Sequence, residues 1–591
     1  MEWVRACTAP EPLSELTLFS DWDSIASMIA SLRIHLFEHG TIPVWNFHFC
    51  GGRPELAVPW SWAWTWPSLF AYALPPNHAI LAAWAALTLL GVASCAALLR
   101  RWTGSGFAAA TGACVYALSG YFAMSFVAGH VTFAFFHLVP LSMLLFERGL
   151  EARLRGRDAL GSAALATLAS FALWSGGLPH AVFHFLPAFG ALALLRVAGA
   201  VRAAGWARGV HAACAPIVAN VLGIWLAAYK LWPVAQWQLL NPRPNVFPES
   251  HGPLAVLAGM LGFVPGFWGS ELLGPRDPFL LGGGAYLGPV PWLVAALPVV
   301  RLLRGRASGD AGGGRAPDRL VTGFALALVL LGLALALGNA NPWSPASWFR
   351  YVPILSGVRG FFRYEILAVF GIAVLVAQGV AGLHRTRTVL AFLAVVPLLA
   401  QAGLLAWRIP ARSKAAIAAR YGGLSRPDPP ELIGVWLGLR QDRTVVLQEG
   451  YWIANCYDNI AMPVRRITAR AGARVPLSDP PPQRLVDLGR DRLTLSFAPG
   501  VEGAIRLLLP GLEGFEYDAP VRSMREGRAQ FRARELTGDR LTIRARYPGV
   551  REGAWASALG GVALGLGGLL AARRGRLRSP ALPRGTSRDG P

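Results

Sequence analysis

Residues 78–99 read HAILAAWAALTLLGVASCAALL and contain no Asp, Glu, Lys or Arg. A helix of about 20 apolar residues is long enough to cross the hydrocarbon core of a bilayer. Similar runs recur along the whole chain. We therefore predict an α-helical polytopic membrane protein with about eleven transmembrane helices, at residues 78–99, 106–127, 130–147, 158–174, 180–196, 211–230, 280–300, 319–337, 364–382, 388–407 and 554–572.

The composition agrees with this fold class. Of the 591 residues, 54% are hydrophobic and only 15% are charged, whereas an average soluble protein carries about 25% charged residues. The net charge of +22 comes almost entirely from arginine. Because these arginines cluster between apolar runs, they indicate membrane topology, and we expect no nucleic-acid partner.

The arginine-rich loops indicate the orientation of the chain. When eleven spans alternate across the membrane, these loops all fall on one side, which the positive-inside rule assigns to the cytoplasm. The other side then receives residues 1–77 and 408–553, and the C-terminal tail 573–591 is cytoplasmic. The arginine clusters lie at residues 100–101, 148–157, 202–208, 301–319, 385–387 and 573–578.

The chain divides into five regions at these boundaries. The transmembrane core comprises residues 78–407, and the extracytoplasmic residues 408–553 differ from it in character. Short apolar strands alternate there with turn residues, which is typical of a small β-sandwich-like domain near the C-terminus. The expected strands lie at 444–447, 492–497, 504–509 and 540–547, and the remaining regions are 1–77, 554–572 and 573–591.

Charged residues suited to catalysis and phosphate binding lie ahead of the first predicted span. Asp21 and Asp23 precede residues 24–37, a helical segment too short to span, which we expect to lie in the membrane interface. A carboxylate there can accept the proton of a hydroxyl group, and Arg53 can bind a phosphate through its fork of donors. The alternative is that the two acids are merely solvated.

Further candidates lie in the other external loops. His130 stands between two spans, where an ionisable group is a functional candidate. Arg359 and Arg363 depart from the charge pattern of the external side, and they bind either a lipid phosphate or anionic headgroups. Glu271 lies near the membrane in the loop 231–279.

Aromatic and metal-binding patterns leave alternatives open. His180 and His184 share a helix face, but they lack the Glu and the third ligand of a zinc site. No CxxC pair occurs among the six cysteines. Alternating tryptophans before the first span form either a sugar-stacking wall or an interfacial belt, and these are Trp60, Trp62, Trp64 and Trp66.

The order of these segments resembles a known family. DWD (21–23), a helix, PVWN (43–46) and CGGRP (50–54) follow one another as in the first external loop of YfhO-type bacterial membrane proteins. Those proteins belong to the GT-C superfamily of membrane glycosyltransferases. The similarity continues at residues 118–122, 129–132, 286–288, 353–363 and 547–549.

This resemblance implies a GT-C-like core in the bacterial cytoplasmic membrane and an active site on the extracytoplasmic face. It implies transfer of a sugar from a polyprenyl-phosphate donor to a cell-envelope glycan or lipid, with Asp21 or Asp23 as the base. A divalent metal serves some branches of the superfamily, so no cofactor is assigned here. Under this hypothesis Arg53, Arg359 or Arg363 would neutralise the donor phosphate, and the site would be lined by Trp45, Asn46, His130 and Glu271.

The sequence departs from the family pattern in places. No spanning helix is expected in residues 1–20, Trp45-Asn46 is followed by Phe47 instead of proline, and Phe515 replaces the usual tryptophan after Gly514. Two alternative functions therefore stay open, a translocator of lipid or polysaccharide without catalysis and an inactive scaffold that keeps the GT-C fold.

Overall fold

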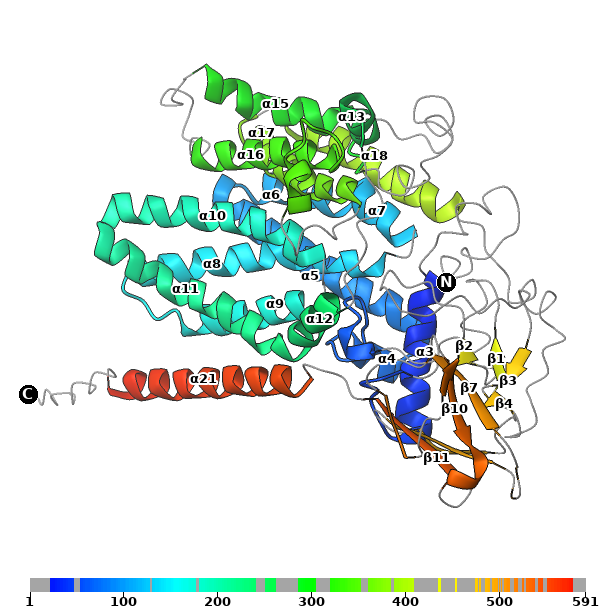
Figure 1. Cartoon of the computed structure of the whole chain (residues 1–591). Coiled ribbons are helices and arrows are strands. Elements are labelled where there is room, and N and C mark those ends of the chain that lie inside the picture. Colours follow the sequence, from blue (N-terminus) through cyan, green and yellow to red (C-terminus); the bar gives the residue numbers. More distant parts are fainter. Residues whose placement is uncertain are drawn as a thin grey trace, which may run out of the picture.

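A computed structural model gives the architecture of the chain (Figure 1). The residues that it describes are 22–46, 54–127, 130–176, 180–240, 250–261, 285–304, 319–351, 360–383, 387–408, 434–436, 452–453, 474–476, 478–479, 484–488, 492–497, 499, 501, 504–510, 515–518, 523–525, 528–536, 540–545 and 550–577.

The described part of the chain has the fold of a helical membrane protein. Seven of its helical segments are long and apolar enough to cross a membrane. They lie in α5 (Pro76–Thr103), α6 (Gly106–Ala117) with α7 (Gly120–Val127), η2 (Val131–His137) with α8 (Leu138–Leu154), α10 (His180–Ala204), α11 (Trp206–Leu226), α16 (Arg319–Ala336), and η4 (Phe361–Tyr364) with α17 (Glu365–Ala381).

The other four expected spans fall on different elements. The spans expected at 158–174, 280–300 and 388–407 correspond to shorter apolar stretches in α9 (Leu160–Gly176), α15 (Pro289–Leu303) and α18 (Arg387–Arg408). The span expected at 554–572 lies within α21 (Val550–Leu577). Among the described residues between 78 and 407, the remaining helical elements are α12 (Ala228–Leu240), α13 (Pro253–Leu261) and η3 (Pro345–Tyr351).

Helix α17 lies at the centre of the helical core. It is buried along nearly its whole length and contacts α6, α15 and α16. A Cβ atom built on Gly371 would lie 2.5 Å from the carbonyl oxygen of Ala325, and one on Gly379 would lie 2.5 Å from that of Val294. Small residues let helix backbones approach closely in this way in membrane proteins.

A buried carboxylate joins three of the core helices. Glu147 of α8 accepts hydrogen bonds from Arg101 Nε at 3.2 Å, Arg196 Nε at 2.6 Å and Trp102 Nε1 at 2.9 Å. These donors come from α5 and α10. Because this carboxylate has its partners within the helices that it joins, we assign it a structural role.

The C-terminal part of the chain forms small sheets beside α3 (Figure 1). One four-stranded antiparallel sheet has the order β5 (Arg484–Leu488), β6 (Arg492–Ser496), β11 (Arg540–Ala545), β8 (Phe515–Tyr517). Another has the order β4 (Ser478–Asp479), β7 (Ala504–Pro510), β10 (Arg528–Arg532), β9 (Ser523–Arg525). A third sheet has the order β2 (Trp452–Ile453), β1 (Gly434–Trp436), β3 (Arg474–Pro476).

Register explains why the strands of the first of these sheets pair as they do. Leu493 lies opposite Ile543 and Leu495 opposite Leu541, and all four side chains are buried. Apolar residues two apart share one face of a strand, so this register gathers them on one side of the sheet. The strands expected at 492–497, 504–509 and 540–547 correspond to β6, β7 and β11, whereas 444–447 lies outside the described residues.

The segment before the first span folds onto the helical core. The short helix expected at 24–37 is present as α3 (Trp22–His39), followed by η1 (Glu55–Ala57) and α4 (Ser68–Ala73). The apolar face of α3 is buried against α4 and α5, through Ile25, Met28, Ile29 and Leu32. Protein side chains thus cover this face, and the expected position of the helix in the membrane interface stays a prediction.

Candidate functional site

A buried carboxylate organises the segment that follows α3. Glu55 is only 2% exposed. Its Oε2 accepts a hydrogen bond from Asn46 Nδ2 at 3.1 Å, and its Oε1 accepts one from Ser61 Oγ. Ser31 Oγ of α3 donates to Asn46 Oδ1 at 3.0 Å. A single hydrogen-bond network thus joins α3, residues 44–46, η1 and the turn after it.

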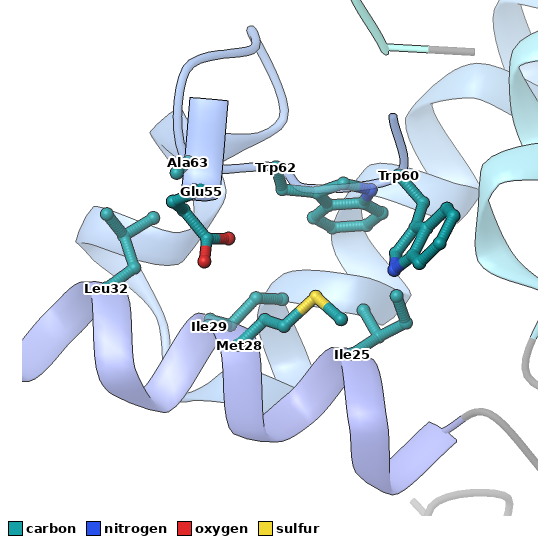
Figure 2. Close-up of a pocket in the computed structure, with 8 residues that line it drawn as sticks. All are labelled: Ile25, Met28, Ile29, Leu32, Glu55, Trp60, Trp62 and Ala63. Atoms are coloured by element: carbon teal, nitrogen blue, oxygen red, sulfur yellow. The ribbon is translucent and has the colours of Figure 1, made fainter. Parts of the chain in front are cut away.

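Glu55 also lines a narrow pocket, and its carboxyl group points into the space between α3 and the following turn (Figure 2). The pocket is too narrow to hold a water molecule in this conformation. A ligand would therefore reach the carboxylate only after α3 or the tryptophans move. The remaining lining residues are Ile25, Met28, Ile29, Leu32, Trp60, Trp62 and Ala63.

Two basic side chains lie near this carboxylate. Burial of His35 lowers its pKa to about 4, with His39 acting in the same direction and Glu55 against it. Lys230 lies in α12, beyond the end of the spanning helix at Leu226, and is 0% exposed. Its burial lowers its pKa to about 7, and the negative charge of Glu55 opposes this shift.

Helix α12 anchors the same loop. The Lys230 ammonium group donates a hydrogen bond to the Ser61 carbonyl oxygen, and the Tyr229 hydroxyl donates to that of Trp64. The ring of Trp45 lies 6.4 Å from that of Trp237. Sequence reasoning found Trp45 and Asn46 but missed Glu55 and Lys230. Glu55 directly follows the CGGRP segment, and Lys230 is one of only two lysines, with Lys414, in the chain.

The alternating tryptophans pack against protein instead of forming an open wall. Trp62 is buried, and Trp60 and Trp64 pack on the same apolar cluster beside α3. Trp64 Nε1 donates to the Pro43 carbonyl oxygen at 2.7 Å. The ring of Trp66 lies 6.1 Å from that of Phe135. Packing of these indoles therefore accounts for the pattern better than a sugar-stacking surface does.

A second cluster forms around Phe133 in η2. The His130 ring centroid lies 5.2 Å from that of Phe133, and the Arg363 guanidinium carbon lies 5.1 Å from the same centroid. The buried ring of Tyr121 stacks on Phe133 at 5.8 Å. His130 and Arg363, two residues selected from the sequence, thus lie against one aromatic ring.

Backbone contacts complete the second cluster. Gly120 N–H donates to the Tyr286 carbonyl oxygen at 2.7 Å. Ala285 N–H donates to Glu365 Oε2 at 3.1 Å, and Glu365 is 3% exposed. Segments from three distant parts of the sequence therefore meet here, and Glu365 is a buried acid that sequence reasoning did not select.

The two clusters are neighbours through η2. Val131 follows His130 directly, and it packs in the same apolar cluster as Ile25, Trp62 and Ile80. The first-loop network and the Phe133 cluster thus share one wall of packed side chains. Any ligand contacting both would lie along the start of η2.

The remaining predicted residues are described only in part. Asp23 lies in the first turn of α3, where only its backbone is described. Asp21, Arg53, Glu271 and Arg359 lie outside the described residues. Within the described residues, no group of three or more His, Cys, Asp or Glu side chains is placed to hold a metal ion.

Comparison of the chain with family models, curated proteins and solved structures gives no match.

Proposed function

We propose that this chain is a membrane glycosyltransferase that moves a sugar from a polyprenyl-phosphate donor to a cell-envelope glycan or lipid. The observation that supports this proposal is the meeting of Tyr121, His130, Tyr286 and Arg363 beside the first-loop network. Each belongs to a segment that resembles the GT-C superfamily. Contact between segments so far apart is what a shared site would require.

Each charged group has a role in this proposal. Asp21 or Asp23 takes the proton from the acceptor hydroxyl as its oxygen attacks the sugar carbon. The bond from that carbon to the phosphate oxygen breaks, and the polyprenyl phosphate leaves with its negative charge. Arg363, with Arg53 and Arg359, neutralises this charge, and the rings of Phe133 and Phe362 hold its guanidinium group in position.

We also propose how the spans and the C-terminal β domain are arranged. Eleven spans in a GT-C-like arrangement would place the first loop and residues 408–553 on the extracytoplasmic face of a bacterial membrane. A sandwich-like β domain in 408–553 would present the acceptor. Contact of β5 with α3, the helix that begins beside the two candidate bases, supports this role.

Transfer of radiolabelled sugar tests the proposal. Membranes containing the chain receive polyprenyl-phosphate sugars, and the Asp21→Asn/Asp23→Asn variant is compared with Glu38→Gln, whose side chain is exposed on the same helix. We expect transfer by the parent and by E38Q. Loss of the base should reduce the rate of transfer by the double variant about 10²–10⁴-fold at equal protein level.

Two outcomes would overturn parts of this proposal. Unchanged transfer by the double variant would exclude both aspartates as the base. Absence of transfer by the parent chain, tried with several donor sugars, would exclude the glycosyltransferase itself. A parallel Arg363→Gln variant, expected to raise the KM for the donor, tests the phosphate-binding role separately.

A further inference from the structure

Helix α21 docks where α11 ends and α12 begins. Ser557 Oγ donates to the Leu226 carbonyl oxygen at 2.9 Å, and Tyr229 N–H donates to Ser557 Oγ at 2.7 Å. A Cβ atom on Gly553 would lie 2.7 Å from the Ala228 carbonyl oxygen. Backbone groups at a helix junction need partners outside the helix, and one side chain of α21 supplies two of them.

The residues just past this junction reach the first loop. Tyr229 bonds to Ser557 with its backbone and to the Trp64 carbonyl oxygen with its hydroxyl. Lys230 donates to the Ser61 carbonyl oxygen, and the Ser61 hydroxyl donates to Glu55. Hydrogen bonds, together with the peptide bond between Tyr229 and Lys230, therefore link α21 to the buried carboxylate.

Burial of Lys230 is unfavourable by itself. An ammonium group loses its hydration when it is buried, whereas an apolar side chain of the same length would fill the space without that cost. The Ser61 carbonyl oxygen and the charge of Glu55 offset part of this cost. The position of Lys230 therefore depends on the position of the Ser61–Glu55 turn.

We infer that Lys230 is a positioning residue through which the docking of α21 holds the Ser61–Glu55 turn of the first loop in place. Because α21 follows β11 in the chain, the C-terminal region would influence the first-loop site through this helix. The coupling itself does not depend on glycosyl transfer, and only its catalytic consequence rests on the proposed function.

Double-mutant cycles on the full-length chain test this inference. Gly553→Leu forces α21 away from α12, whereas Gly565→Leu is the matched control, since a Cβ there meets nothing within 4 Å. Each is combined with Glu55→Leu, which removes the acceptor of Asn46 and Ser61. The measurement is the apparent thermal unfolding midpoint in detergent at one heating rate.

The expected result is a loss of additivity in one cycle only. Glu55→Leu should lower the midpoint equally in the parent and in G565L, and by less than half as much in G553L. Distant sites without shared partners usually contribute additively. Equal lowering in all three backgrounds would overturn the inference. If G553L does not fold, Ser557→Ala replaces it, because that change removes two hydrogen bonds without a steric clash.

Activity supplies a second and separable readout. If the chain transfers sugar, Lys230→Met and Ser557→Ala should lower kcat with little change in the KM for the donor, and Gly565→Leu should leave both unchanged. Unaltered kcat in both test variants would contradict a positioning role. If the parent chain transfers nothing, the proposed function fails, while the thermal cycles still decide the coupling.

Discussion

At the residue scale, the oxygens of Glu55 hold the first loop against α3. They accept hydrogen bonds from Asn46 and Ser61, and Asn46 in turn accepts one from Ser31. A buried donor that loses its acceptor costs about 1–3 kcal/mol. The Glu55 network therefore constrains the geometry of the first loop more sharply than apolar packing would.

The burial of His35 makes stability depend on pH. Its pKa is about 4 in the folded chain against 6.5 for the ordinary side chain. The unfolded state therefore binds more protons between these values, and stability is lost as pH falls from about 6.5 to 4. The shift corresponds to about 3 kcal/mol. We expect the unfolding midpoint to fall less between pH 7 and 4.5 in His35→Gln than in the parent.

The control for this titration is Phe37→Leu on the same helix, because the Phe37 side chain is exposed and does not titrate. This variant should keep the pH dependence of the parent chain. His39 and Glu55 face His35, and His39 lowers the pKa of His35 while Glu55 raises it. An identical slope in H35Q and the parent would show that His35 does not carry the effect.

At the element scale, the position of a short helix depends on which surface buries its apolar face. The apolar spacing of α3 predicts a helix with one apolar face, but a membrane surface and a protein surface satisfy that face equally well. In the folded chain α4, α5 and Val131 cover it. The apolar spacing of α3 therefore predicted the helix but could not predict its position.

Helix packing around α17 yields a prediction of its own. A methyl group at Gly371 would lie 2.5 Å from the Ala325 carbonyl oxygen, whereas one at Gly323 meets nothing within 4 Å. Gly371→Ala should force α16 and α17 apart and lower the thermal midpoint. Gly323→Ala, on the facing helix, should be neutral or stabilising because Ala favours helix by about 1 kcal/mol over Gly. Equal midpoints would contradict this close approach.

At the scale of the whole molecule, α21 connects the C-terminal strands to the helical core. It contacts α11 and α12 (Figure 1), and α12 anchors the first loop. The arginine pattern further predicts that the C-terminus is cytoplasmic. A green fluorescent protein fused after Pro591 should therefore fluoresce, and alkaline phosphatase fused at the same place should be inactive. The opposite pair of results would reverse the predicted topology.

The hydropathy of the sequence predicted much of the helical part of the fold. The residue types and their order predicted only part of the candidate site. Asn46 bonds to Glu55, Trp45 beside it packs on Trp237, and His130 and Arg363 meet at Phe133. Glu55, Lys230 and Glu365 were missed, because a lone acid or lysine in sequence resembles any solvated side chain. Their burial is a property of neighbours that lie up to hundreds of residues away.

The sequence by itself determined that this chain is a helical membrane protein, because the length and hydropathy of a run are local properties that set its cost in water and in lipid. It also determined where several strands form, since alternation is equally local. Only the tertiary structure decided which polar groups are buried together. Lys230 reaches Ser61, and Ser557 reaches Tyr229, through contacts between residues separated by 169 and 328 positions. Such pairings depend on how the helices pack, and no local pattern specifies that.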